Sequence, residues 1–290
     1  MSLDHAKTAV ITGAGSGIGK ALALALSRRG YRIGIVDIDL EAAQETLQEM
    51  KAAGGTGDAY RCDVGDAPQV LAMADHFFDT WGEVGLLVNN AGIGAGGWVG
   101  EASLEDWRRV VHVNLWGVIN GCHAFVPRMK LQGRGHIVNT ASTAGLVAVM
   151  GFASYSTTKA AVVAFTETLL VELAPFGIGV TVLCPSIVRT NIMEHSMAVL
   201  DMDGLEAAEW GSSLIEAGME YSKISCDDVS RMVIEGIEND RLFVVTNRVS
   251  RSNWRNARMS PEKYFKLMAW RNKKGWLQGF MLWATRRGIA

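Results

Sequence analysis

Residues 8–20 read Thr8-Ala-Val-Ile-Thr-Gly13-Ala-Gly-Ser-Gly17-Ile-Gly19-Lys20, and the expected architecture follows from this stretch. A short run rich in β-branched residues predicts a buried strand, and an Ala/Leu-rich helix follows over 20–30. The glycines between them would let backbone N–H groups approach a phosphate, where the helix dipole adds positive potential. However, the spacing Gly-x-x-x-Gly-x-Gly differs from the usual dinucleotide fingerprint. A tight strand-to-helix turn that needs positive φ explains these glycines equally well.

Asp37 ends the next predicted strand, 31–37, and lies 18 residues after Gly19. An acidic residue at this point of a dinucleotide-binding unit accepts hydrogen bonds from the adenosine ribose. A carboxylate there would also repel a 2′-phosphate, which favours NAD over NADP. The alternative is an N-cap for the helix over 40–51, but Asp39 is better placed for that. We therefore favour the ribose role for Asp37.

Strand and helix patterns then alternate along the chain, which predicts βαβ units and an α/β fold with a doubly wound parallel sheet. We expect one domain over residues 1–247. In such sheets ligands bind beyond the carboxyl ends of the strands, near the point where the strand order reverses. Asp63, Asn90, Gly92 and Ser142 all fall at predicted strand ends. The remaining expected elements are strands at 57–62, 85–88, 136–142, 179–184 and 242–246, and helices at 68–81, from 111, through 155–173 and at 227–237.

Tyr155 and Lys159 are four residues apart on a predicted helix, so the phenol and the ammonium share one face. An unperturbed phenol has a pKa of about 10. A nearby ammonium favours the phenolate and would bring that pKa toward neutrality. Ser142, thirteen positions upstream, could hold a substrate oxygen at the same place. Taken alone, such a pair is more commonly two surface neighbours.

Several further motifs occur in the same order, each after its predicted strand: Thr12-Gly13-x-x-x-Gly17-x-Gly19, Asp63-Val64, Asn89-Asn-Ala-Gly92, Asn114, Ser142, Tyr155-x-x-x-Lys159 and Pro185 to Thr190. Over roughly residues 6–247 the chain therefore resembles the short-chain dehydrogenase/reductase family. The resemblance implies a Rossmann fold and an NAD(P)-dependent enzyme that interconverts an alcohol and a ketone.

The resemblance also implies roles for individual residues. Tyr155 would be the acid/base, Ser142 would hold the substrate oxygen, Lys159 would bind the nicotinamide ribose and lower the pKa of Tyr155, and Asn114 would order a water. Cofactor contacts are implied for the glycine loop, the adenosine-binding positions and the nicotinamide end of the site: Gly13, Ser16, Gly17, Ile18, Gly19, Asp37, Asp63, Val64, Asn90, Ala91, Gly92, Tyr155, Lys159, Pro185, Val188 and Thr190. Ser186 departs from the glycine that the family usually carries after the proline.

Residues 191–224 interrupt the strand–helix alternation at the place where the family has a substrate-covering segment. They contain Met193, Met197, Met202, Met219 and Trp210, which suit an irregular apolar substrate surface or, equally, two short core helices. The other expected pocket walls, 94–98 and 146–152, carry no charge. We therefore expect a neutral, rather hydrophobic alcohol or ketone as substrate.

Composition excludes several classes of protein. The 290 residues are 49% hydrophobic and 20% charged, as expected of a globular chain with a sizeable core. Cys62, Cys122, Cys184 and Cys226 form no CxxC and no cluster with histidine, which argues against a disulfide framework or a metal site and fits a reducing cytoplasm. No signal peptide fits before the first apolar run, and no stretch is apolar enough to span a bilayer.

The last fifty residues differ in charge from the rest of the chain. Residues 1–240 hold 16 Lys and Arg against 29 Asp and Glu, whereas residues 241–290 hold 12 against Glu262 alone. We expect residues 248–290 to form a basic amphipathic extension, with a helix that begins at Ser260-Pro261. It could lie on an anionic membrane, but packing across a subunit interface or against the chain's own body is favoured, since aromatic residues and Arg are enriched at interfaces. Nucleic-acid binding is disfavoured because no such motif accompanies the charge. Beyond Ser260, Lys and Arg alternate with apolar residues that include Tyr264, Phe265, Met268, Trp270, Trp276, Phe280 and Trp283.

The sequence thus predicts an NAD-dependent oxidoreductase that acts on a secondary alcohol or its ketone and forms a homodimer or homotetramer. Two alternatives stay open at this point. One is an NADPH-dependent carbonyl reductase. The other is a dinucleotide-binding or membrane-peripheral protein without catalytic activity, although the complete set of Ser142, Tyr155 and Lys159 counts against it.

Overall fold

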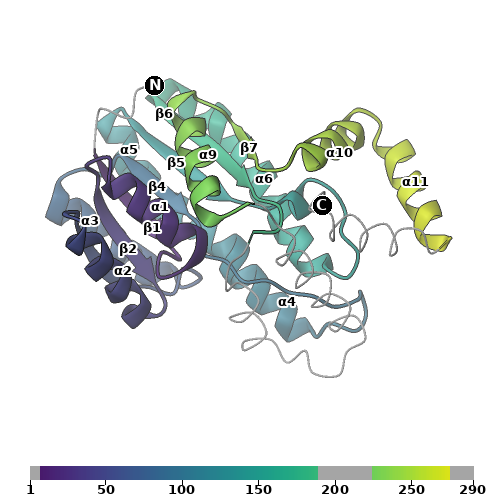
Figure 1. The fold of residues 1–290 in the computed structure, drawn as a ribbon, viewed down its shortest axis with the longest axis horizontal. Coiled ribbons are helices and arrows are strands. Elements are labelled where there is room, and N and C mark those ends of the chain that lie inside the picture. Colours follow the sequence, from purple (N-terminus) through teal and green to yellow (C-terminus); the bar gives the residue numbers. More distant parts are fainter. Residues whose placement is uncertain (1–6, 189–223, 275–290) are drawn as a thin grey trace.

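The computed structural model describes residues 7–188 and 224–274. Within them, seven parallel strands form one sheet in the order β3-β2-β1-β4-β5-β6-β7 (Figure 1). The strands are β1 (Thr8–Thr12), β2 (Arg32–Asp37), β3 (Thr56–Arg61), β4 (Leu86–Asn89), β5 (Gly135–Thr140), β6 (Ile178–Cys184) and β7 (Phe243–Val245). The predicted doubly wound parallel sheet is confirmed.

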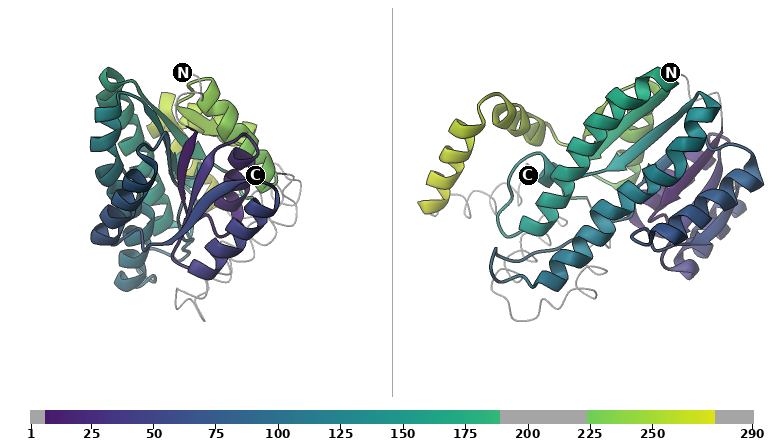
Figure 2. Two further views of the ribbon diagram at one scale, coloured as in Figure 1. Left: turned by 90° about the vertical axis from the view of Figure 1, so that its left-hand side faces the viewer. Right: turned by 180° about the vertical axis from the view of Figure 1, so that it is seen from behind.

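Helices cover both faces of the sheet (Figure 2). One face packs against α1 (Gly17–Ser27), α2 (Leu40–Ala52) and α9 (Cys226–Glu238). The other packs against α3 (Ala67–Trp81), α5 (Gly117–Gln132) and α6 (Ala153–Leu173). A further helix, α4 (Leu104–Val111), leads into α5 through one π-helical turn, η1 (His112–Trp116), and two 3-10 turns, η2 (Thr143–Gly145) and η3 (Ala174–Phe176), flank α6.

The strands are apolar on both sides because both sides are covered. In β1, Ala9 and Ile11 join the core on the α1 side, whereas Val10 joins the core on the α3 side. Gly34 of β2 lets α3 approach closely, since a Cβ there would lie 2.6 Å from the ring of Phe77. Alternation of side chains along each strand thus supplies two separate cores from one sheet.

The strand order reverses between β1 and β4. From β1 the chain builds outward to β2 and β3, then returns to place β4 on the other side of β1. The connections after these two strands therefore leave the sheet in opposite directions, and a crevice opens between them at the carboxyl ends. The loops that follow β1, β4, β5 and β6 all emerge at this edge, which is where the sequence places its candidate site residues.

The described part of the C-terminal extension consists of α10 (Arg248–Met259) and α11 (Pro261–Lys273), which project from the body (Figure 1). The start of α11 agrees with the predicted helix, whereas α10 was not predicted. Trp254 of α10 packs against Phe243, and Arg258 Nη1 lies 2.6 Å from Glu167 Oε1 of α6. No residue of α11 is buried. Over residues 7–188 and 224–274, no helix has both the length and the apolarity needed to cross a bilayer.

Candidate active site

The glycine loop after β1 forms an open cradle at the N-terminus of α1, of the kind that an anion site requires. Gly13 and Gly17 have φ of 63° and 56°, which a residue with a Cβ adopts only under strain. A Cβ on Gly19 would lie 2.2 Å from the Gly13 carbonyl oxygen, so the loop folds against the first turn of α1. Ser16 is the N-cap of α1, and its side chain makes no capping hydrogen bond. The N-terminus of α1 thus keeps backbone donors for a diphosphate.

Asp37 faces this loop. Its Oδ2 accepts a hydrogen bond of 2.9 Å from the Gly15 backbone N–H, and its Oδ1 accepts one of 3.1 Å from the Asp39 N–H. The N-cap of α2 is Asp39, which accepts from the N–H groups of Glu41 and Ala42. The choice between Asp37 and Asp39 as the cap is therefore confirmed. The Asp37 carboxylate keeps lone pairs beside the cradle, as a ribose contact requires.

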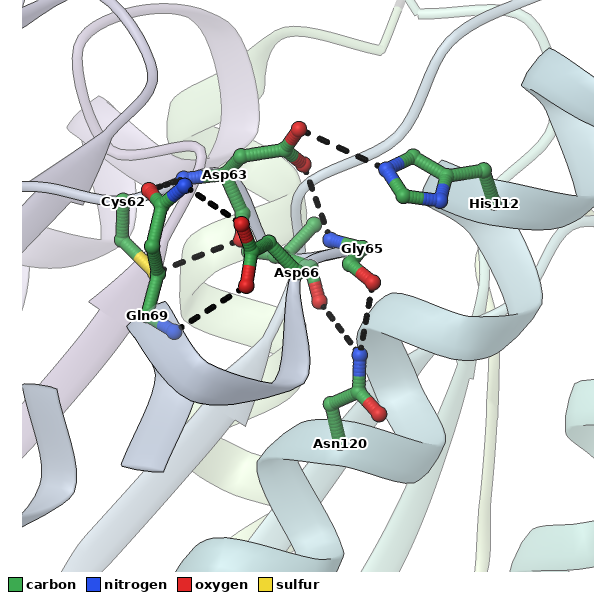
Figure 3. A network of polar contacts seen from close by, with 8 residues as sticks. Cys62, Asp63, Gly65, Asp66, Gln69, His112 and Asn120 are labelled. Atoms are coloured by element: carbon green, nitrogen blue, oxygen red, sulfur yellow. Dashed lines mark hydrogen bonds and ion pairs between the residues drawn. The ribbon is translucent and has the colours of Figure 1, made fainter. Parts of the chain in front are cut away.

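Hydrogen bonds from three sides hold the loop after β3 (Figure 3). The Asp63 N–H donates to Gln69 Oε1 of α3 at 3.0 Å. Asn120 Nδ2 of α5 donates to the carbonyl oxygens of Val64 and Gly65 at 2.9 and 3.1 Å. Asp63 Oδ1 accepts from the Gly65 N–H at 2.9 Å. Neither Gln69 nor Asn120 belongs to a motif in the sequence, and Asn120 lies 55 residues along the chain from the Gly65 carbonyl that it contacts.

The loop after β4 is tied to the loop after β1. Asn90 Nδ2 donates to the carbonyl oxygens of Thr12 and Gly13 at 3.0 and 3.2 Å. Thr12 Oγ1 accepts from the backbone N–H groups of Asn90 and Ala91 at 3.0 and 3.1 Å. These bonds fix the two sides of the crevice relative to each other. Thr12 therefore has a structural role in the site, which its position in the motif did not specify.

Asn114 lies in the π-helical turn and is fully buried. Its side-chain amide forms a reciprocal pair with the backbone of Ile93, donating to the carbonyl and accepting from the N–H, both at 2.9 Å. A Cβ on Gly92 would lie 3.1 Å from Asn114 Oδ1 and 3.2 Å from Lys159 Nζ. Gly92, Asn114 and Lys159 therefore converge below the loop after β4.

Ser142, Tyr155 and Lys159 come together at the carboxyl ends of β5 and β6. The Ser142 hydroxyl lies close enough to the Tyr155 phenol to act on its pKa, and it also accepts a hydrogen bond from the Ala144 N–H at 3.1 Å. Lys159 is buried, its Nζ donates to the Thr140 carbonyl oxygen at 3.0 Å, and it lies 5.7 Å from the centroid of the Tyr155 ring. The sequence prediction that these side chains share one site agrees with their placement.

Burial dominates the proton affinities in this cluster. It lowers the pKa of Lys159 from 10.5 to about 8, which the neighbouring Cys184 thiol partly offsets. It also raises the pKa of Tyr155, against which the hydrogen bond from Ser142 acts. The expectation that Lys159 brings the Tyr155 pKa below its ordinary value is not met here. Burial of the phenol is the largest cause of the raised pKa, and the ammonium of Lys159 is directed at the Thr140 carbonyl oxygen.

The segment after β6 is described as far as Val188. The Pro185 carbonyl accepts from the Thr143 N–H at 2.9 Å, and Val188 is buried in the core on the α1 side. Ser186 donates its backbone N–H to Thr246 Oγ1 at 2.9 Å, and its hydroxyl lies 3.2 Å from the same oxygen. The departure from glycine at 186 thus adds a contact to the end of β7. Thr190 and the expected substrate segment up to residue 223 lie outside the described residues.

The residues present fit a dinucleotide. An open helix N-terminus suits the diphosphate, Asp37 suits a ribose, and the buried ammonium of Lys159 suits a second ribose at the other end of the crevice. In the described parts of the chain, no three His, Cys, Asp or Glu side chains gather as metal ligands would. None of the four cysteines, all of which lie among the described residues, forms a disulfide.

Comparison with known proteins agrees with this arrangement. The family model for the short chain dehydrogenase matches residues 7–199. A crystal structure of a short chain dehydrogenase/reductase from Burkholderia phymatum in complex with NAD has a TM-score of 0.86 and 35% identity. The match covers 90% of this chain and 96% of that one.

Two curated relatives are also similar. The probable oxidoreductase EphD of Mycobacterium tuberculosis is 43% identical over 184 residues, which are 63% of this chain but 31% of EphD, so the match spans about a third of that longer protein. The cyclohexanol dehydrogenase of an Acinetobacter strain is 39% identical over 188 residues, covering 64% of this chain and 75% of the relative.

Proposed function

The chain belongs to the short-chain dehydrogenase family, and from this we propose that it is an NAD-dependent oxidoreductase that interconverts a neutral, rather hydrophobic secondary alcohol and its ketone. The observation that carries the proposal is the cluster of Ser142, Tyr155 and buried Lys159 at the open edge of the sheet. A phenol beside a serine hydroxyl and a buried ammonium is suited to exchange a proton with a substrate oxygen.

In this proposal each side chain of the cluster has a separate task. Tyr155 takes the proton of the alcohol or gives one to the ketone, and Ser142 holds the same oxygen, so that the alkoxide that develops faces two donors. Lys159 binds the nicotinamide ribose and holds positive charge near the phenol. A bound nicotinamide supplies the hydride acceptor or donor, which no side chain can. Asn114 is proposed to order a water that connects Lys159 to solvent.

The proposed cofactor contacts follow the site from one end to the other. The diphosphate meets the cradle, Asp37 the adenosine ribose, Asp63 and Val64 the adenine, and the remaining positions the central part and the nicotinamide. These are Gly13, Ser16, Gly17, Ile18 and Gly19 in the cradle, Asn90, Ala91 and Gly92 at the centre, and Pro185, Val188 and Thr190 at the nicotinamide.

The preference for NAD over NADP is argued from Asp37. Its carboxylate is fixed against the Gly15 N–H at 2.9 Å and cannot swing away without losing that bond. A 2′-phosphate on the adenosine ribose would place a second negative group beside it, and like charges at short range repel. The NAD complex of the Burkholderia phymatum protein supports the same choice.

The substrate class is argued from two uncharged segments. Gly97 pairs with Phe152 in an isolated parallel bridge, and the Gly97 N–H donates to the Gly151 carbonyl at 2.8 Å. Residues 94–98 and 146–152 are thereby brought together just before Tyr155, and neither contains an ionisable side chain. Such walls favour a neutral apolar substrate. The name of the cyclohexanol dehydrogenase relative is in keeping with this class.

We further propose a homodimer or homotetramer in which the basic extension packs at a subunit contact. The compartment proposed is the cytoplasm, because four cysteines that form no disulfide suit a reducing environment.

The test of the proposed function is a panel of linear and cyclic secondary alcohols incubated with the purified chain and either NAD or NADP. Absorbance of the reduced nicotinamide should rise with NAD and an apolar alcohol, and far more slowly with NADP. A protein that binds NAD in calorimetry yet reduces it with no alcohol, and oxidises NADH with no ketone, would contradict the proposal. Faster turnover with NADP would contradict only the cofactor choice.

A further inference from the structure

His112, the first residue of the π-helical turn, contacts the loop after β3 (Figure 3). Its Nε2 lies 3.4 Å from Asp63 Oδ2. The side chains of His112 and Asp63 are 47% and 32% exposed, so the pair lies at the surface of the protein in contact with solvent. With its proton on Nε2, the imidazole donates to the carboxylate. Neither the sequence motifs nor the proposed function gives His112 a role.

Gly65 provides the space that the imidazole occupies. A Cβ at this position would lie 2.1 Å from His112 Nε2, closer than any real contact. The Gly65 N–H donates to Asp63 Oδ1, the other oxygen of the same carboxylate. One oxygen is thus held by the backbone and the other by the imidazole, and together they fix the plane of the carboxylate.

The loop itself does not depend on His112. Its backbone is held by Gln69 from α3 and Asn120 from α5, through bonds of 2.9–3.1 Å that involve the N–H of Asp63 and the carbonyls of Val64 and Gly65. Loss of the imidazole would therefore leave the loop in place and free only the rotation of the carboxylate. This separates an effect on orientation from an effect on folding.

The carboxylate has a donor beside it. Among residues 7–188 and 224–274, no group accepts a hydrogen bond from the Val64 N–H. An N–H donor next to a fixed carboxylate acceptor is complementary to the edge of adenine, which offers an acceptor at N1 and a donor amino group at N6. Hypoxanthine offers the reverse, an N–H at position 1 and an oxo group at position 6.

We propose that His112 positions the Asp63 carboxylate for the N6 amino group of adenine and thereby sets the preference of the site for adenine over hypoxanthine dinucleotides. The inference rests on the proposed function, in which this loop receives the adenine of NAD. It makes His112 a positioning residue, because it acts through Asp63 and touches no reacting atom.

The test is calorimetric binding of NAD and of nicotinamide hypoxanthine dinucleotide to the full chain. The wild-type chain should bind NAD at least about fivefold more tightly than the analogue. His112→Ala should reduce the ratio of the two affinities at least about threefold, mainly by weakening the binding of NAD. Gly65→Ala should do the same, because its Cβ displaces an intact imidazole. His112→Gln, whose amide can donate from a similar place, should restore most of the ratio.

Kinetics and a matched control separate positioning from a general structural role. In His112→Ala, the KM for NAD should rise while kcat at saturating NAD stays within about twofold. His123→Ala, an exposed histidine of α5, should change neither ratio nor KM. An unchanged NAD-to-hypoxanthine ratio in His112→Ala, or equal weakening of both dinucleotides, would overturn the inference. A chain that binds neither dinucleotide would instead overturn the proposed function.

Discussion

Lys159 is a buried cation whose Nζ donates to the backbone carbonyl of Thr140 at 3.0 Å. Removing an ammonium from water is costly, which is why its pKa drops to about 8. In the proposed mechanism this cost has a use, because a weakly solvated ammonium acts strongly on a ribose and on a nearby phenol. The residue therefore favours function at the expense of stability.

This cost predicts a pH dependence. Because the folded pKa of Lys159 is below the unfolded value, the folded state binds fewer protons between about pH 8 and 10.5. The free energy of unfolding of the wild type should therefore rise with pH across that window, by about 3 kcal/mol in total when that of Lys159→Met is subtracted. Urea denaturation of both proteins from pH 7 to 10.5 measures the difference. A constant difference across the window would show that the ammonium is not desolvated.

Tyr155→Phe removes the hydroxyl and leaves the ring. Turnover should fall at least about a hundredfold, the range for loss of a general acid or base. NAD affinity should stay within a few-fold, since the phenyl ring still fills the same space. Stopped-flow or steady-state absorbance gives the rate, and calorimetry gives the affinity. A variant as active as wild type would exclude Tyr155 as the acid/base.

Asp37→Ala should narrow the preference for NAD over NADP at least about tenfold, because it removes both a charged acceptor and a repulsive charge. The ratio of kcat/KM for the two cofactors is the measurement. Asp39→Ala is the control: it removes the N-cap of α2 and costs about 1 kcal/mol of stability, yet should leave the cofactor ratio unchanged. Tighter binding of NADPH than NADH by the wild-type chain would contradict the argument.

At the scale of the element, the glycine loop and α1 act as one unit. A Cβ on Gly19 would lie 2.2 Å from a backbone oxygen, which cannot rotate away as a side chain can. Gly19→Ala should therefore lower the free energy of unfolding by about 1–3 kcal/mol and weaken NAD binding together. Thermal unfolding with and without NAD measures both effects. Wild-type NAD affinity in this variant would show that the loop is not the cofactor cradle.

Element boundaries show where sequence patterns suffice and where they do not. The strand at 8–12 and the helix from Pro261 were predicted because a β-branched run and a Ser-Pro start are local signals. The predicted helix from residue 111 is in fact three pieces, α4, η1 and α5. Its earlier start is set by Ser103, whose side chain accepts from the Asp106 N–H. A π-turn leaves no period in the sequence, so it could not be predicted.

The same contrast holds within the site. The residues at strand ends could be placed from the sequence, because parallel strands bring their carboxyl ends to one edge. The partners that hold them could not: Thr140 for Lys159, Ile93 for Asn114, and Thr246 for Ser186. Each of these bonds joins segments far apart in the chain, and the direction of the Tyr155 pKa depends on burial that only packing determines.

At the scale of the whole molecule, charge is divided between an acidic body and a basic extension. α10 already shows how the extension meets the body, through Arg258 on Glu167 and Trp254 on Phe243. α11 offers Phe265 and Leu267, each more than 40% exposed, beside several lysines. An acidic surface on a second copy would complement it, whereas an anionic membrane would repel the body that carries it.

Ending the chain after Met259 should therefore lower the number of subunits in the proposed oligomer. The body should stay folded, since no residue of α11 is buried. Light scattering should give fewer subunits per particle for the shortened chain than for the full chain. The melting temperature should change by less than about 5 °C. Raising the salt concentration from about 0.05 to 0.5 M should also lower the number of subunits per particle of the full-length chain. Lys263→Glu with Lys266→Glu in the full chain is the charge-reversal counterpart. Equal numbers of subunits per particle for the full and shortened chains would contradict an interface role.

The turn between α4 and α5 closes its hydrogen bonds over one residue more than a regular helix does. Excising one residue there would let the two helices fuse into a continuous rod with little loss of packing elsewhere. The deletion would rotate either His112 or Asn114 by about 100° around the helix axis, so the two side chains could no longer both make their present contacts. Under the proposed function, the extra residue would let one short segment serve both ends of the dinucleotide, and a gap in an alignment at this turn should then be far rarer than a change of side chain.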